Sequence, residues 1–153
     1  MSLETDDAEE IKELLSYEDE SVGSIMNKDF ISFNIELSVG ETLELLRELN
    51  ADEEVMNYVY ITDNNDRLKG VVTLRDLILN QEKEKITNIM HTLGINVKID
   101  NNIGEAAEIA IKYDLISIPV VDYEEKLVGI VLIHDILDEL LPHSWKKKFK
   151  KAN

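Results

Sequence analysis

The chain has no cysteine among its 153 residues. This absence excludes disulfide frameworks, thiolate zinc sites and cysteine nucleophiles. Long apolar runs are also missing, since none approaches the roughly 18–20 residues that a helix needs to cross a bilayer. The acidic start, MSLETDDAEE, lacks the basic and apolar regions of a signal peptide. We therefore expect a soluble protein that works in the cytoplasm.

Catalytic motifs are a second absence. The histidines His91, His134 and His143 show no metal-ligand spacing such as HExxH, and no Walker loop or GxGxxG occurs. The segment DNNDRLKG begins like a calcium loop, but it has no glycine at its sixth position and is better explained as a hairpin turn. We therefore expect that the chain is not an enzyme.

Basic residues are scarce, because 16 Lys+Arg stand against 32 Asp+Glu and the net charge is -16. Five of the lysines lie in the C-terminal stretch KKKFKK, so residues 1–143 carry only 11 basic residues against all 32 acidic ones. Such a body repels a phosphate backbone, and nucleic acid is not an expected partner. A divalent cation such as Mg²⁺ fits better, because carboxylate oxygens are its preferred ligands. The alternative is an acidic surface that only keeps the protein soluble.

An internal repeat bears directly on the fold. Residues 59–78, VYITDNNDRLKGVVTLRDLI, align without gaps on residues 118–137, IPVVDYEEKLVGIVLIHDIL. Upstream, SIM matches NIM and GET matches GEA at a larger offset, 64 residues instead of 59. The first copy therefore contains five additional residues around NADEEVMN.

Each copy has the pattern of a β-α-β-β-α unit. Ser38 with Glu41, and Asn102 with Glu105, are helix-start patterns before the periodic segments VGETLELLREL and AAEIAIKY. YVYIT and ISIPVV are typical of strands, and the polar stretches DNNDR and DYEEK are typical of hairpin turns. A unit of about 60 residues has too small a core to be stable alone. We predict an α+β fold in which two such units pack around a pseudo-two-fold axis, preceded by a short acidic helix, DDAEEIKELLS.

This duplicated order resembles a tandem pair of CBS domains, which associate into a Bateman module. The resemblance rests on the openings SIM and NIM, the strand IPVVD, and a glycine followed six residues later by aspartate. LLSYEDESVGSIM, NYVYITDNNDRLKGVVTLRDLIL and KYDLISIPVVDYEEKLVGIV are similar to the cytoplasmic region of the MgtE family of magnesium transporters. The expected divisions are a lead-in at 1–20, repeats at 21–82 and 83–141, and a basic tail at 142–153.

The stretch TLRD at 73–76 is the candidate nucleotide site. Thr-x-x-Asp is also a capping box that begins a helix, and the two roles are compatible. The resemblance implies that Thr73 and Asp76 contact an adenosine nucleotide, with the carboxylate accepting hydrogen bonds from the ribose hydroxyls. The Thr73 hydroxyl and the first helix amides suit phosphate, and Arg75 adds a charge-assisted contact. Leu132 replaces Thr73 in the second copy, so we predict one nucleotide per chain.

Three more residues enter the nucleotide site through the resemblance. It implies that Tyr58 stacks on adenine and that Ile118 and Pro119 line the same cleft from the opposite repeat. The residues alone leave alternatives open. Tyr58 could equally be a strand tyrosine that faces the core, and IPVV a buried strand entry with an early proline.

The resemblance also implies a metal site, because Asp114, Asp135 and Asp138 match positions at which the MgtE family places Mg²⁺ between subdomains. Asp135 and Asp138 are three residues apart on the closing helix and share one side of it. Mg²⁺ uses one or two protein carboxylates, and the family places a further one on a helical acidic domain that is mostly missing here. His134 stands where an acidic residue is expected. The alternative is a set of solvated surface carboxylates.

The resemblance implies a regulatory sensor that binds an adenine nucleotide, Mg²⁺ or both, and changes the geometry of its homodimer. A transporter membrane domain or another effector would receive the signal, and the chain is either a piece of a transporter or a free-standing relative. The alternative function is a ligand-free dimerisation or docking module. The lysine-rich tail is interpreted as a frayed terminus, although such clusters can touch anionic membranes, so direct membrane contact is not expected.

Overall fold

The structure is a computed structural model that describes residues 20–56, 58–92 and 94–141. The expected acidic helix at 6–16 and the basic tail at 142–153 lie outside these residues, and their predictions remain untested. None of the helices in the described ranges is long and apolar enough to span a membrane.

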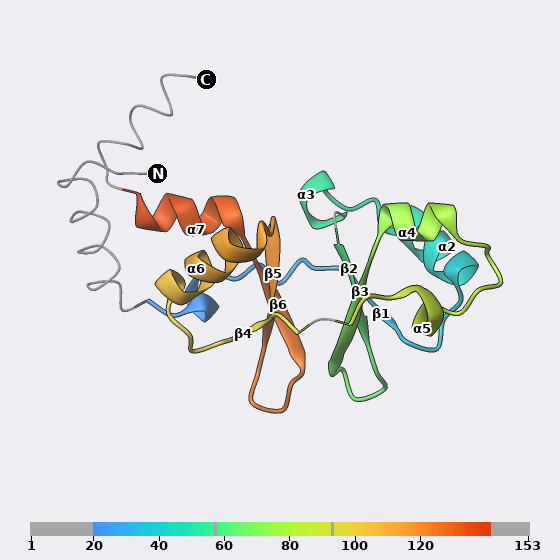
Figure 1. Ribbon diagram of the computed structural model, residues 1–153, viewed down its shortest axis with the longest axis horizontal. Helices are drawn as coiled ribbons and strands as arrows, with labels where there is room; N and C mark the ends of the chain where they lie inside the picture. The colour runs from blue at the N-terminus through green and yellow to red at the C-terminus, as the bar shows by residue number, and fades with distance from the viewer. Residues whose placement is uncertain (1–19, 57, 93, 142–153) are drawn as a thin grey trace, which may run out of the picture.

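Two three-stranded sheets stand side by side with helices around them (Figure 1). Each sheet has a parallel pair and an antiparallel hairpin, in the orders β1-β2-β3 and β4-β5-β6. The elements of the first half are β1 (Ser32–Asn34), α2 (Val39–Leu49), α3 (Glu53–Met56), β2 (Tyr58–Thr62), β3 (Leu68–Thr73) and α4 (Leu74–Leu79). Those of the second half are β4 (Val97–Lys98), α6 (Ile103–Tyr113), β5 (Ser117–Val121), β6 (Leu127–Leu132) and α7 (Ile133–Leu140).

The predicted α+β class and the repeated β-α-β-β-α order are confirmed in the described residues. The five additional residues of the first copy hold the short helix α3, which has no counterpart between α6 and β5. The length difference between the repeats is therefore absorbed by one added helical turn, and the two sheets keep the same strand order.

The starts of α2 and α6 follow the capping signals in the sequence. Ser38 Oγ accepts a hydrogen bond from the Glu41 amide at 3.2 Å, and the Glu41 carboxylate accepts one from the Ser38 amide at 3.1 Å. Asn102 Oδ1 accepts from the Glu105 amide at 2.8 Å. These contacts satisfy amides that the helix itself leaves unpaired. Both predicted helix starts are confirmed.

Two apolar cores lie against the sheet faces that the helices cover, and the first extends across the seam to Ile130 and Leu132 of β6. In the first core Val59, Ile61 and Val72 are inaccessible to solvent, and Leu77 of α4 is 1% exposed. The second core contains the fully buried side chains Val22, Ile103, Ala106, Ile118, Val120, Val131 and Ile136, with Val97 of β4 only 1% exposed. Alternate residues of the strands point to the opposite face, where the two halves meet.

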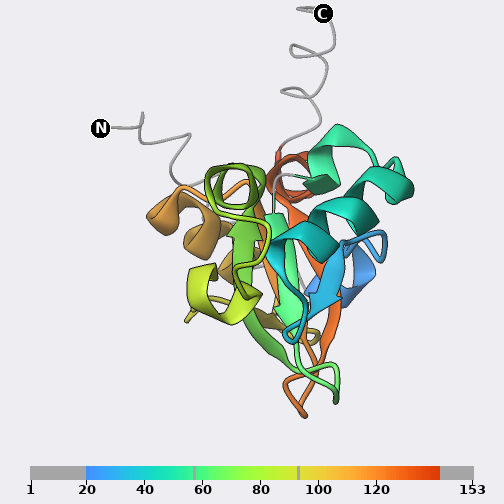
Figure 2. The same ribbon diagram turned by 90° about the vertical axis from the view of Figure 1, so that its right-hand side faces the viewer.

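The opening segment of each repeat packs on the other half. The 3-10 turn η1 (Val22–Ser24) begins the first repeat, yet its Val22 amide donates to the Asn101 carbonyl at 2.7 Å. The short helix α5 (Ile86–Ile89) begins the second repeat, yet the Ile86 amide donates to the Leu37 carbonyl at 3.1 Å. Figures 1 and 2 show α5 beside α2 and α4. Both halves therefore need both repeats to complete their cores.

The two β-hairpin turns are built alike and touch each other. The Asp63 carboxylate accepts hydrogen bonds from amides two and four residues ahead, and Asp122 repeats this pattern. DNNDR and DYEEK are thus hairpin turns, as predicted. The turns join through the Leu68 amide to the Glu125 carbonyl at 3.1 Å and the Leu127 amide to the Asp66 carbonyl at 3.0 Å. This reciprocal pair lies where a pseudo-two-fold axis relates the halves.

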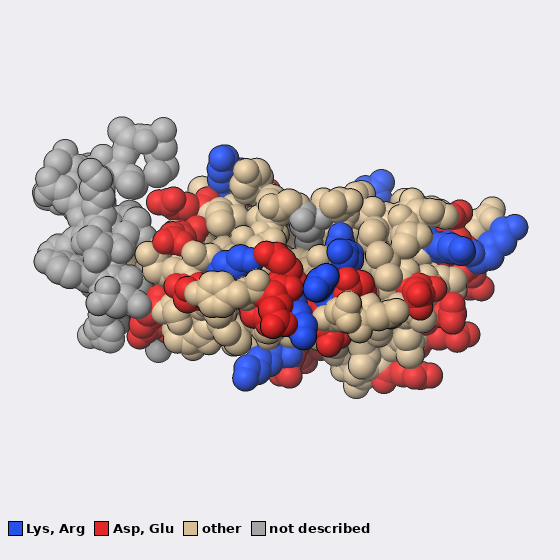
Figure 3. Space-filling view, turned by 90° about the horizontal axis from the view of Figure 1, so that it is seen from below, with Lys and Arg blue, Asp and Glu red and all other residues tan. Residues whose placement is uncertain are grey.

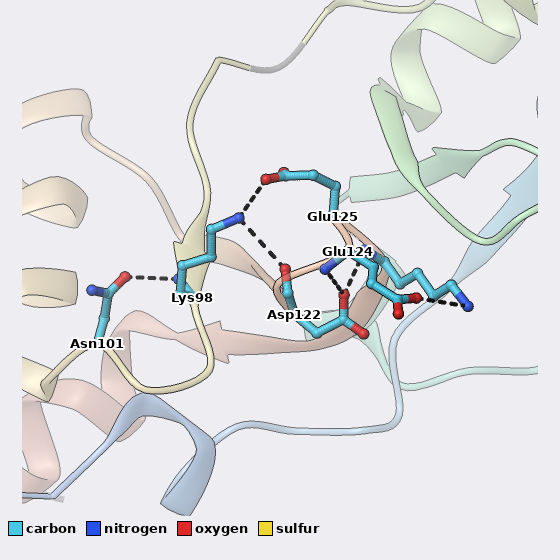
Figure 4. Close-up of polar contacts among 6 residues, drawn as sticks. Lys98, Asn101, Asp122, Glu124 and Glu125 are labelled. Atoms are coloured by element: carbon cyan, nitrogen blue, oxygen red, sulfur yellow. Dashed lines mark hydrogen bonds and ion pairs between the residues drawn. The ribbon is translucent and has the colours of Figure 1, made fainter.

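Charges of both signs interleave on the face that carries the turns (Figure 3). Lys98 binds Glu125 and reaches the Asp122 carbonyl, which ties β4 to the second turn (Figure 4). Lys126 pairs with Glu124 at 3.3 Å. Both signs meet around the turns, while acidic side chains predominate toward the outer end of the first half (Figure 3).

Candidate functional site

The candidate site lies at the seam between the halves. The register of β2 and β3 places Tyr58 opposite Thr73 and Tyr60 opposite Val71, so these four side chains share one face. This face is turned toward the second half. There the Tyr60 hydroxyl lies 2.9 Å from Ser117 Oγ on β5, and both side chains are buried.

A pocket of about 120 Å³ opens beside this contact. It is lined from both halves, by Tyr58, Tyr60, Val71, Ile95, Leu115, Ser117 and Pro119. Its walls are almost entirely carbon, with the two buried hydroxyls bonded to each other. Two larger hollows occur elsewhere, near the C-terminal ends of α2 and α6. The seam pocket suits the apolar faces of one flat ring.

A carboxylate stands where β3 runs into α4, just beyond the pocket. Asp76 Oδ2 accepts a hydrogen bond from the Thr73 amide at 2.9 Å, and the Asp76 amide donates to Thr73 Oγ1 at 3.1 Å. This is the predicted capping box, and it is confirmed. His91 Nε2 also lies 3.1 Å from Asp76 Oδ2. Thr73 is on the same sheet face as Tyr58, so the box adjoins the pocket.

Asp76 is held in its charged form. Partial burial by itself raises the pKa of this carboxyl, but the hydrogen bonds from Thr73 and the nearby His91 outweigh it and lower the pKa below its ordinary value. A charged carboxylate accepts two or more hydrogen bonds and suits a pair of hydroxyl donors. Oδ1 accepts none from the described residues and is available to a ligand.

The other predicted nucleotide residues take different places. Tyr58 and Pro119 line the seam pocket, while the Arg75 side chain is exposed on α4 and forms no ion pair with a described residue. Ile118 is different, since its side chain is fully buried in the second core. Successive strand residues alternate between faces, so Pro119 and Ser117 face the pocket and Ile118 does not. The prediction that the Ile118 side chain lines the cleft is therefore not supported by its position.

The corresponding place in the second half is closed by an apolar side chain. Leu132, which replaces Thr73, is 3% exposed and packs in the first core. No side chain caps α7, as the missing hydroxyl predicts. Asp135 pairs with its neighbour His134 at 3.2 Å, and Asn27 occupies the pairing position that His91 has in the first half. The two halves are thus chemically unequal.

The predicted metal ligands do not form a cluster. Asp114 ends α6 in a left-handed conformation with φ 53°, and Asp135 and Asp138 lie on α7. No group of three or more acidic or histidine side chains that could hold a metal ion occurs within residues 20–56, 58–92 and 94–141. A Mg²⁺ site at these carboxylates would need ligands from elsewhere.

Sequence reasoning missed His91 and the pair Tyr60–Ser117. His91 follows NIM directly, but its approach to Asp76 depends on the exchange of opening segments, which no local pattern encodes. Tyr60 and Ser117 are 57 residues apart. The repeat alignment alone could have placed both on central strands, since β2 and β5 match, but not in contact across the seam.

Burial raises the pKa of Tyr60 to about 12 from 10.0, although its hydrogen bond with Ser117 acts in the opposite direction. The stability linked to this neutral hydroxyl is complete below pH 10 and is lost as the pH rises through about 12. The shift of about two pKa units, at about 1.36 kcal/mol each, predicts an alkaline loss of about 3 kcal/mol. Urea titrations at several pH values measure it.

The matched variant for this prediction is the double change Tyr60→Phe with Ser117→Ala. It removes both hydroxyls, so no buried polar atom is left unpaired at neutral pH. The alkaline loss should shrink in this variant and persist in Tyr113→Phe, whose side chain is 48% exposed. An unchanged alkaline loss in the double variant would contradict the assignment to Tyr60.

Comparison with known proteins bears on this site. The CBS domain profile matches residues 22–83 and 86–142. The magnesium transporter MgtE of Enterococcus faecalis is 38% identical over 134 residues, which are 88% of this chain and 30% of the transporter. The chain therefore spans about 30% of the length of this relative.

Solved structures agree with the profile. The crystal structure of the cytosolic domain of the Mg²⁺ channel MgtE in complex with ATP superposes with a TM-score of 0.74 at 35% identity, covering 89% of this chain and 55% of that one. A CBS domain pair in complex with methylthioadenosine and S-adenosyl-L-methionine gives 0.62 at 27% identity, covering 88% and 98%. The chain belongs to the CBS domain family, with two CBS domains in tandem that resemble the cytosolic part of MgtE magnesium transporters.

Proposed function

We propose that this CBS pair is a regulatory module of magnesium transport that binds one adenine nucleotide per chain at the seam. The observation that carries the proposal is an apolar pocket between the halves, next to a charged carboxylate with a free oxygen. A nucleoside has matching parts, a flat base and a ribose with two hydroxyls. The related cytosolic domain of MgtE in complex with ATP and the pair in complex with adenosine derivatives support the choice of adenine.

The nucleotide would use both halves at once. Its base would stack on Tyr58 and contact Pro119 from the opposite half, while Asp76 accepts hydrogen bonds from the ribose. The Thr73 hydroxyl and the exposed Arg75 are near enough in sequence to reach the first phosphate, as charge-assisted contacts. One such site per chain follows because Leu132 closes the equivalent place.

Mg²⁺ sensing is the second part of the proposal. Asp114, Asp135 and Asp138 would supply only some of the ligands, with the remainder from a neighbouring acidic domain and from water. Bound Mg²⁺ would neutralise carboxylates that otherwise repel each other in a chain of net charge -16. The module would act on the cytoplasmic side of a transporter membrane domain, as the MgtE relative suggests.

A homodimer would transmit the signal. Several large apolar side chains remain exposed on the outer faces of the helices, namely Leu45 and Leu49 on α2, Ile78 and Leu79 on α4, and Leu137 on α7. A second copy would cover such a surface. A ligand can shift the geometry of this dimer only by its different affinity for the two arrangements.

A thermal-shift panel with AMP, ADP, ATP, S-adenosylmethionine and Mg²⁺, each added alone, tests the proposal. A ligand at 100 times its Kd stabilises the fold by about 2.7 kcal/mol, and at least one adenine compound should raise Tm by several degrees. If a nucleotide raises Tm but Mg²⁺ does not, the Mg²⁺-sensing part of the proposal is wrong and the nucleotide site stands.

The second candidate function is a ligand-free docking module. The observation that favours it is that the chain already occupies parts of its own site, with His91 on Asp76 and Ser117 on Tyr60. In this case no compound of the panel would change Tm, and nucleotide regulation would have to be abandoned.

A further inference from the structure

The hydroxyl pair of Tyr60 and Ser117 is a polar feature of the seam pocket that the proposed function does not use. Most of the other lining side chains carry no polar atom, and Tyr58, which does, is only half-buried. We propose that the Tyr60–Ser117 pair selects the base, by donating one hydroxyl hydrogen to a ring nitrogen of a bound purine. The proposal rests on the proposed function and deepens it, because it names the part of the nucleotide that the pocket distinguishes.

The pair has one hydrogen to spare. A hydroxyl group has one hydrogen to donate and two lone pairs that accept. The bond between the two oxygens, 2.9 Å long, uses one of the two hydrogens, whichever residue donates it. Neither hydroxyl forms a second hydrogen bond within residues 20–56, 58–92 and 94–141. One O–H group of the pair therefore still needs an acceptor.

Burial keeps this hydrogen away from bulk water. Tyr60 is 2% exposed and Ser117 is 5% exposed. Burial also raises the pKa of Tyr60 to about 12, so its hydroxyl keeps its hydrogen at neutral pH. A buried donor without an acceptor costs free energy. The pocket borders both residues, so a ligand inside it can supply the acceptor that the described chain does not.

The strands bring the pair next to the stacking position. Tyr58 and Tyr60 are two residues apart on β2 and share one face of it. Ser117 and Pro119 repeat this arrangement on β5. Side chains with this spacing are about 7 Å apart along a strand. A ring that stacks between Tyr58 and Pro119 can therefore turn one edge toward the hydroxyls.

A single donor among carbon walls favours adenine over guanine. The ring nitrogens of either base can accept the hydrogen, but the two bases differ at their edges. Guanine carries both a carbonyl oxygen and an amino group there, whereas adenine carries an amino group alone. Each polar group that the pocket buries without a partner weakens binding. Adenosine should therefore bind at least about five times more tightly than guanosine.

The experiment measures the binding of adenosine, guanosine and three deaza-adenosines by calorimetry at neutral pH. In each deaza analogue a C–H group replaces one ring nitrogen, N1, N3 or N7, so one acceptor is lost while the shape is kept. One of these analogues should bind the wild-type chain about five- to fiftyfold more weakly than adenosine, because the spare hydrogen then has no acceptor.

The matched variant is the double change Tyr60→Phe with Ser117→Ala. It removes both hydroxyls, so neither a donor nor an acceptor of the pair is left unpaired. Adenosine and the weakly binding analogue should then have equal affinities. Tyr113→Phe, which changes a tyrosine that is 48% exposed and does not line the seam pocket, should keep the wild-type difference.

The wild-type series needs no variant, so it tests the proposal even if the double variant is unstable. Equal binding of adenosine and all three analogues, or a difference that persists in the double variant, would overturn this role and leave nucleotide binding intact. Guanosine binding as tight as that of adenosine would also contradict it. If the wild-type chain binds none of the five nucleosides, the proposed nucleotide site is wrong together with this role.

Discussion

Leu77→Ala should lower the free energy of unfolding by about 2–5 kcal/mol, the range for a buried leucine cut to alanine. Leu77 is 1% exposed and packs in the first core beneath α4. The change removes apolar contacts and leaves a cavity that the surrounding strands cannot fill. Urea unfolding followed by circular dichroism measures the loss. Ile78→Ala on the same helix, where the side chain is 70% exposed, should change the stability of the monomer by less than about 0.5 kcal/mol.

The same titration tests whether the halves unfold together. The first core contains Ile86 from the second repeat, and Ile130 and Leu132 from β6 pack against it. Loss of the first core should therefore unfold the second half as well, in one transition seen equally by circular dichroism and by fluorescence. Two separate transitions, of which Leu77→Ala shifts only the first, would show that packing between the halves contributes little to the stability of the second half.

Asp76→Asn should weaken adenine nucleotide binding about ten- to a hundredfold. A hydrogen bond to a charged group is worth about 1.5–3 kcal/mol, and the amide cannot accept from both ribose hydroxyls as a carboxylate does. Asparagine keeps a side-chain oxygen for the Thr73 amide, so the cap of α4 is largely preserved. Calorimetry with the nucleotide that gives the largest thermal shift measures the change.

The matched control for this variant is Asp135→Asn, the equivalent position in the second repeat. Because Leu132 closes the place beside it, this change should leave nucleotide affinity unaltered. If Asp135→Asn weakens binding as much as Asp76→Asn, the chain has two equivalent sites and the assignment of one nucleotide per chain is wrong.

The sequence predicted the parts of the fold that depend on short-range signals. The starts of α2 and α4 follow from side chains three residues apart, which bond within one turn. The hairpins follow from aspartates that accept from their own turns, at Asp63 and Asp122. The repeat itself supplied the order of strands and helices in both halves.

Contacts between distant segments were beyond such reasoning. The side of the sheet that Ile118 faces depends on strand register, and one residue separates the buried core from the pocket wall. The approach of His91 to Asp76 depends on which half receives the segment that contains it. Both questions concern tertiary packing, so the sequence predicted the capping box of Thr73 and Asp76 but neither its contact with His91 nor the complete lining of the pocket.

The reciprocal join of the two turns limits where movement can occur. The backbone bonds between Leu68 and Glu125 and between Leu127 and Asp66 fasten the halves at one end, and Tyr60 and Ser117 fasten them near the pocket. These bonds should therefore keep the angle between the two halves of one chain nearly constant.

A single repeat could not complete its own core, because the opening segment of each repeat packs on the other half. A lone repeat would lack the residues that close its core, while its own opening residues would find no surface to cover. Two identical copies of one repeat would satisfy each other by exchanging these residues, as domain-swapped dimers do. An ancestor with one repeat would thus have folded as a homodimer, and gene fusion would have joined two chains that already depended on each other to fold.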